Sequence, residues 1–180
     1  MTSAFNRFRL FHWLLAGLFL AAYLTGDDAE LFHVWLGYGL LAVLLARLMT
    51  LPLKPRGFPK PVPPRGAWRK PGLGDVGKWL TFLALIGSAL TLALGLCLVD
   101  NGAVLAAVIP GVPENLFGGI GDSALMRWLG EQDDAHEFFA ELVLFLVGLH
   151  IAYMLLFRRR SVIPMLRGLQ PKGSLIAQRD

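Results

Sequence analysis

The chain has 180 residues, of which 55% are hydrophobic and 17% are charged, and its mean hydropathy is +0.55. Soluble domains are less apolar and more charged than this, and disordered chains are poor in apolar residues, so the composition excludes both classes. A single cysteine excludes a disulfide framework and a cysteine-ligated zinc or iron–sulfur site.

Four long apolar stretches follow one another along the chain, and each approaches the roughly 20 residues that cross a bilayer. We expect helices at about residues 8–25, 30–50, 76–99 and 134–157. The first is expected to be retained rather than cleaved as a signal peptide, because no clear small-residue cleavage site precedes Gly26. The sequence therefore predicts an all-α integral membrane protein, a four-helix bundle that forms one domain over residues 1–180.

The basic residues lie on one side of this topology. Sixteen of the seventeen Lys and Arg lie at or before the start of the first helix, in or beside the segment that joins the second to the third, or after the fourth, and only Arg127 lies on the other side. The acids on the side of Arg127 are Asp27, Asp28, Glu30, Asp100, Glu114, Asp122, Glu131, Asp133 and Asp134. Cytoplasmic loops of membrane proteins are rich in Lys and Arg. Both termini are therefore expected in the cytoplasm.

This topology makes residues 51–75 a cytoplasmic loop, residues 100–133 an outer loop and residues 158–180 a cytoplasmic tail. The Pro-, Gly- and Lys/Arg-rich 51–75 loop is expected to lie near anionic lipid headgroups. The net charge of +4 then follows from topology, and no basic–aromatic motif indicates binding to nucleic acid.

All four histidines fall inside the predicted membrane helices, where ionisable side chains by default mark function. His12 and His150 lie toward the cytoplasmic side, and His33 and His136 toward the outer side. His136 and His150 are 14 residues apart, which places them on one face of a helix about 21 Å apart. Two pairs at two depths are what two b-type haems need. Taken singly, each histidine could instead be an interhelical hydrogen bonder.

Several segments around these histidines resemble the bacterial cytochrome b561 family, which includes the b-type cytochrome subunit of nickel–iron hydrogenases. They are Arg9-Leu-Phe-His12-Trp13, His33-Val-Trp-Leu-Gly37-Tyr38, Ala46-Arg47-Leu48, His136-Glu137, Leu149-His150 and Ser161-Val-Ile-Pro-Met165. The resemblance implies a multi-pass di-haem cytochrome of the bacterial cytoplasmic membrane. It implies two haem b groups with His12, His33, His136 and His150 as ligands. The depth argument pairs His12 with His150 and His33 with His136.

The resemblance also implies electron transfer between the quinone pool and a redox protein at the outer face, such as a cytochrome c or a dehydrogenase subunit. A subunit of this kind is favoured over a stand-alone enzyme. Glu141 and Glu137 are candidate proton acceptors at a quinol site near the outer haem, although both could simply be solvated or bonded to a neighbouring helix. Arg127 is a candidate partner for a haem propionate.

Two other functions stay open on the same residues. One is an oxidoreductase that takes electrons from a small species such as superoxide and passes them to quinone. The acidic outer side disfavours it, because steering of an anion needs clustered Lys or Arg. The other is a non-redox metal permease that uses the four histidines. It predicts ligands clustered at one depth, whereas these lie at two.

Overall fold

The computed structural model is helical throughout its regular segments, and the residues it describes contain no strand. It describes residues 4–26, 30–53, 62–63, 65–69, 72–98, 103–114 and 132–168. Four helices are long and apolar enough to cross a membrane. They are α1 (Ala4–Leu24), α2 (Glu30–Leu53), α4 (Val76–Leu98) and α8 (Gln132–Phe157). The prediction of an all-α membrane protein is thereby confirmed, and every helix end lies within four residues of its expected place.

The segments between and after the four helices hold shorter elements that the sequence did not predict. The 51–75 loop contains α3 (Arg65–Arg69) and a single 3-10 turn, η1 (Leu73–Asp75). The outer loop begins with α5 (Ala103–Ala106), a single turn. The tail forms α9 (Arg159–Arg167). The two single-turn helices are too short to show an apolar period. In α9 the apolar residues Val162, Ile163, Met165 and Leu166 do follow a helical spacing, but Pro164, which normally interrupts a helix, lies among them.

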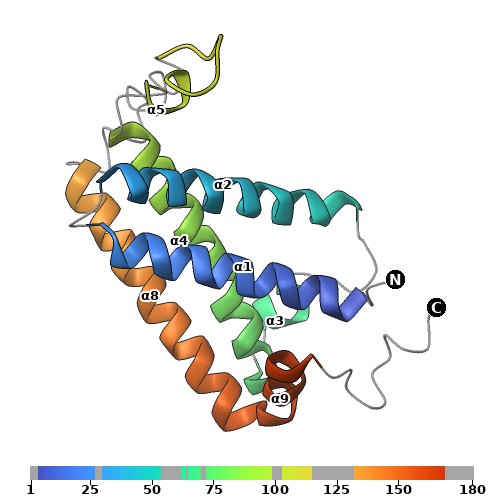
Figure 1. Cartoon of the computed structure of the whole chain (residues 1–180). Coiled ribbons are helices and arrows are strands. Elements are labelled where there is room, and N and C mark those ends of the chain that lie inside the picture. The colour runs from blue at the N-terminus through green and yellow to red at the C-terminus, as the bar shows by residue number, and fades with distance from the viewer. Residues whose placement is uncertain are drawn as a thin grey trace.

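The four long helices form two antiparallel pairs, α1 with α2 and α4 with α8, which Figure 1 shows crossing one another. Glycines on α4 bring α8 unusually close. A Cβ atom added at Gly77 would lie 2.7 Å from the ring of Tyr153, and one at Gly87 would lie 2.7 Å from Val143. Small residues let helix backbones approach in membranes, where van der Waals packing replaces the hydrophobic effect between helices. Among the helices that the structure describes, α4 and α8 are therefore the most closely packed pair.

The two pairs meet through leucines. Leu40 and Leu44 of α2 and Leu92 of α4 are buried together. Around them pack partly buried side chains, namely Leu15, Leu18, Phe19, Leu41 and Leu85. The outer surfaces of the same helices remain apolar, with Phe138 and Phe145 of α8 largely exposed. An exposed apolar surface on membrane-spanning helices faces lipid, so this arrangement is that of a protein in a bilayer.

Helix α9 turns back from the end of α8 and docks on the first half of α1 (Figure 1). The indole N–H of Trp13 donates to the carbonyl of Met165 at 3.2 Å, and the Arg9 guanidinium donates to the carbonyl of Leu166 at 3.4 Å. These carbonyls lie in the last turn of α9, where helix carbonyls lack partners within the helix and attract cations. Gly168 then ends the helix in the left-handed conformation, with φ of 72°.

The glycine contact between α4 and α8 can be tested by filling it. We expect Gly87→Val to lower stability by about 1–3 kcal/mol, because the new side chain overlaps Val143 in a packed interface. The measurement is the apparent Tm of the detergent-solubilised protein. Gly17→Val is the matched control, since no atom lies within 4 Å of a Cβ at Gly17. Equal Tm values for the two variants would contradict this account of the interface.

Candidate functional site

Two of the four histidines face each other where α2 meets α8. The ring centres of His33 and His136 lie 6.0 Å apart, with their planes at 81°. Two imidazoles bound to opposite sides of one metal ion, at about 2 Å per metal–nitrogen bond, have ring centres about 6 Å apart. The spacing of His33 and His136 would therefore allow both residues to hold one iron.

Each of these two rings is oriented by a backbone carbonyl. Nδ1 of His33 lies 2.8 Å from the carbonyl oxygen of Ala22, and Nδ1 of His136 lies 2.9 Å from that of Thr91. A carbonyl can only accept, so Nδ1 carries the proton in both rings, and Nε2 keeps its lone pair. Metal-binding histidines commonly have their second nitrogen fixed in this way. The local geometry therefore prepares the Nε2 atoms of both residues as ligands.

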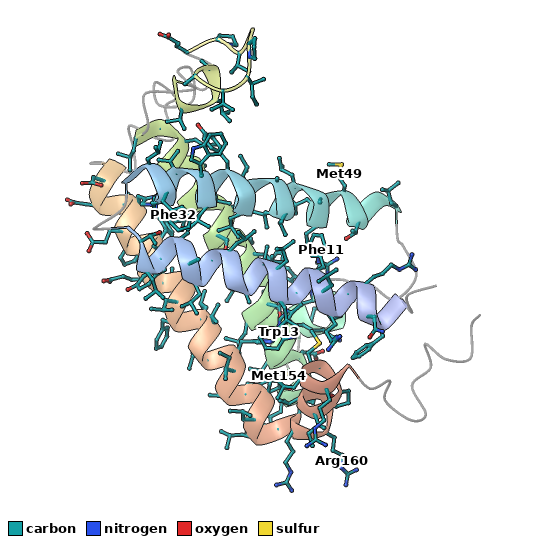
Figure 2. All side chains as sticks on the ribbon, in the orientation of Figure 1. Phe11, Trp13, Phe32, Met49, Met154 and Arg160 are labelled. Carbon is teal, nitrogen blue, oxygen red and sulfur yellow. The ribbon has the colours of Figure 1, made fainter. Side chains whose placement is uncertain are left out.

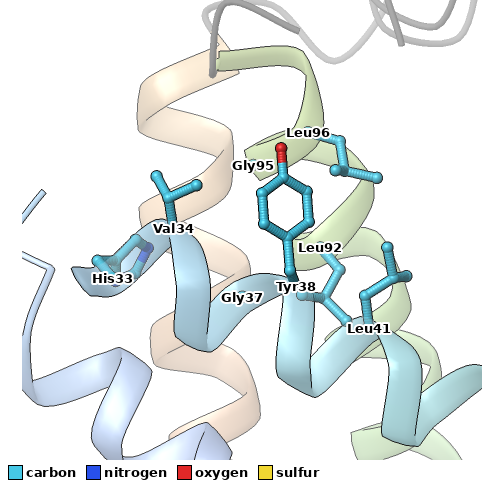
Figure 3. A pocket seen from close by; sticks show the side chains of 8 residues that line it. All are labelled: His33, Val34, Gly37, Tyr38, Leu41, Leu92, Gly95 and Leu96. Carbon is cyan, nitrogen blue, oxygen red and sulfur yellow. The ribbon is translucent and has the colours of Figure 1, made fainter. Parts of the chain in front are cut away.

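A small cavity of about 50 Å³ adjoins His33 between α2 and α4. Figure 3 shows its walls, which include Gly37 on α2 and Gly95 on α4. A Cβ at Gly95 would lie 2.9 Å from Cε1 of His136, so glycine is what lets that ring reach the Thr91 carbonyl. The hydroxyl oxygen of Tyr38 also lies on this cavity and is buried without a hydrogen-bond partner in the structure. The close approach at this level is therefore that of α4 to α8, and the cavity lies between α2 and α4.

The other two histidines, His12 and His150, line one cavity of about 580 Å³ at the opposite end of the bundle. Its volume falls within the roughly 300–1,000 Å³ of cofactor pockets. Most of its wall is apolar, and α9 closes one side through Val162 and Met165. Trp13 and Met154, which also line it, are labelled near α9 in Figure 2.

Two cationic side chains, Arg47 and Lys78, complete the wall of this cavity. Arg47 lies near the end of α2, is only 7% exposed, and donates to the hydroxyl of Thr50 at 2.6 Å. Lys78 pairs with Asp75 at 3.4 Å. Two imidazoles, an apolar interior and cations at one end suit a flat apolar ring that carries carboxylates, which describes a haem and its propionates. The residues at this level therefore fit a b-type haem, and those at the other level supply two imidazoles.

The remaining candidates lie elsewhere. Glu137 and Glu141 both have exposed side chains on α8, and the structure brings neither of them to a histidine. Arg127 lies outside the described residues. Among the described residues, no three His, Cys, Asp or Glu side chains gather into one group.

The sequence did not reveal the groups that orient the histidines. The sequence offered a weak indication that the Ala22 carbonyl could accept a hydrogen bond from a side chain. Ala22 lies in the last turn of α1, where carbonyls lack a full set of partners within the helix. No local pattern indicated the role of the Thr91 carbonyl, because Thr91 lies in the middle of α4. That carbonyl meets His136 only because of the way α8 packs on α4. The burial of Arg47 was also missed, because its place at the predicted cytoplasmic end of a helix already accounted for a basic residue.

No curated protein and no solved structure matches the chain. The family model described as prokaryotic cytochrome b561 matches residues 6–168. This range covers all four apolar helices, both histidine pairs and α9. The chain therefore belongs to the prokaryotic cytochrome b561 family, whose members are multi-pass b-type cytochromes of the bacterial inner membrane that carry electrons.

Proposed function

We propose that this protein binds two haem b groups and transfers electrons between the quinone pool and a redox protein at the outer face of the membrane. The observation that carries the proposal is the division of the four histidines into two pairs on separate levels. His33 and His136 face each other at one level, and His12 and His150 share a cavity at the other. The levels are about 21 Å apart along α8.

Each group of residues has a defined task in this proposal. The four histidines hold iron through their ring nitrogens. Arg47 and Lys78 bind the propionates at the cytoplasmic level, and the leucines around Leu92 keep water out of the space between the levels. When bound, each haem supplies a one-electron carrier that alternates between ferric and ferrous iron. The protein's own contribution is to place two such carriers in line across the bilayer.

The orientation follows from charge. With sixteen of seventeen Lys and Arg on one side, we place both termini, α9 and the His12–His150 cavity at the cytoplasmic face. The His33–His136 pair then lies toward the outer face. Glu141 is the proposed proton acceptor for quinol, since its exposed carboxylate lies on the surface that a quinol in the lipid would approach. The acidic outer side favours a partner with a basic docking face over capture of superoxide.

Haem content tests the central proposal. We expect two b haems per purified chain by pyridine haemochrome, one in His12→Ala, one in His33→Ala and none in the double variant. Gly148→Ala is the control and should keep two, because Gly148 is an exposed residue of α8 with no atom within 4 Å of a Cβ. A haem-free wild-type protein, or single variants that keep both haems, would refute the di-haem assignment.

Reporter fusions test the orientation. A C-terminal fluorescent protein should fluoresce, because it folds in the cytoplasm, and a C-terminal alkaline phosphatase should be inactive there. Inserted after Glu114 in the outer loop, the phosphatase should instead be active. The opposite pattern would place the termini outside and reverse the assignment of the two levels.

Salt dependence tests the partner. We expect a basic soluble cytochrome c to bind membranes that contain this protein, and to bind several-fold more weakly when ionic strength rises from 0.01 to about 0.15 M, since exposed charges are screened over about 8 Å at the higher value. Control membranes without the protein set the background. Binding that does not change with salt would remove the acidic outer side as the docking feature.

A further inference from the structure

We infer that α9 binds the headgroups of anionic phospholipids, and that this contact holds the helix against the cavity of His12 and His150. The inference concerns the surrounding membrane and does not depend on the proposed function. It comes from two opposite faces of α9. One carries exposed arginines, and the other forms part of the cavity wall.

The end of α8 sets the level of α9 in the bilayer. Helix α8 crosses the membrane as far as Phe157, and α9 begins two residues later at Arg159. A helix that starts so close to the end of a span begins at the level of the lipid headgroups. Ile163 and Leu166 of α9 are 54% and 60% exposed. Arginines together with exposed apolar side chains at this level are typical of a helix that lies in the membrane interface.

Arg160 and Arg167 form the outward face of α9. They are seven residues apart, about 20° short of two full turns, so both lie on one side of the helix and about 10 Å apart along its axis. Both side chains are exposed, and Figure 2 shows Arg160 at the edge of the molecule. The sequence from Arg158 to Gly168 contains no acid, and no described carboxylate pairs with either guanidinium. Because arginine binds phosphate through two parallel hydrogen bonds, this face suits the phosphates of anionic lipids.

The opposite face of α9 closes the cavity. Val162 lies two positions after Arg160, and Met165 lies two positions before Arg167. Each is therefore about 200° around the helix from an arginine. Both Val162 and Met165 line the cavity of about 580 Å³. A contact that holds the arginines at the membrane surface therefore keeps the other side of the helix turned toward the cavity.

The hydrogen bonds that seat α9 on α1 leave a role for such a contact. Trp13 donates to the Met165 carbonyl at 3.2 Å and Arg9 donates to the Leu166 carbonyl at 3.4 Å, and both bonds are exposed. They are longer than most protein hydrogen bonds, and water competes for their groups. Lipid phosphates bound to the arginine face add contacts on the other side of the helix, which stabilise the same position.

Lipid binding by the full-length protein tests the arginine face. The purified protein is titrated in detergent with phosphatidylglycerol or phosphatidylcholine, and bound lipids are counted by native mass spectrometry. We expect several-fold more bound phosphatidylglycerol, and loss of that preference in Arg160→Gln combined with Arg167→Gln. The matched control, Lys172→Gln with Arg179→Gln, removes the same charge from the segment after α9 and should keep the preference. Equal binding of the two lipids by the wild type, or an unchanged preference in the α9 variant, would overturn the inference.

Cysteine labelling tests whether the lipid holds α9 in place. Cys97→Ala removes the native thiol, and Val162→Cys then reports on the face that lines the cavity. In nanodiscs of equal parts phosphatidylcholine and phosphatidylglycerol, a water-soluble maleimide should label this position several-fold more slowly than in phosphatidylcholine alone, because the seated helix shields it. With Arg160→Gln and Arg167→Gln added, the two rates should agree.

Leu73→Cys is the control for labelling. This position in η1 is 75% exposed, so its rate corrects for the effect of lipid charge on the reagent and the thiol. After this correction, equal rates at Val162→Cys in the two kinds of nanodisc would show that the lipid does not hold α9 and would overturn that part of the inference.

Discussion

A histidine inside a bilayer must have its ring nitrogens satisfied by the protein or by a metal, because the hydrocarbon offers no water. Much of this structure follows from that constraint. His33 reaches across from α2 to a carbonyl of α1, and His136 reaches from α8 to a carbonyl of α4. Each bond therefore ties together the two helices of one pair. The same contacts hold the two rings with their centres 6.0 Å apart, so the bonds that join the helices also fix the positions of both imidazoles.

The two ends of the bundle solve this problem in different ways. At the level of His33 and His136 the cavity is only about 50 Å³, and backbone carbonyls accept from the rings. At the level of His12 and His150 the helices leave about 580 Å³ of mostly apolar space. The two histidine pairs therefore lie in surroundings of very different openness.

Much of this architecture could be predicted from the sequence, because length and hydropathy alone identify helices that cross a bilayer. The histidine spacing on α8 also fixed two levels, since helical rise converts 14 residues into a distance. What could not be predicted depends on the contacts between helices. The sequence around Gly95 does not distinguish it from other helical glycines. Only the position of the His136 ring shows why a residue with a Cβ atom would not fit there. The docking of α9 on Trp13 likewise joins residues 152 positions apart, which no local pattern records.

Helix α9 forms a wall of the cytoplasmic cavity, and its seat on α1 involves the first and the last described helices of the chain. A ribosome delivers α9 only after all four membrane helices have been made. The cavity around His12 and His150 is therefore incomplete until the chain has been synthesised through Leu166, and it stays open at that end during assembly. The order of residues along the chain thus makes the closure of this cavity one of the last steps in the assembly of the protein.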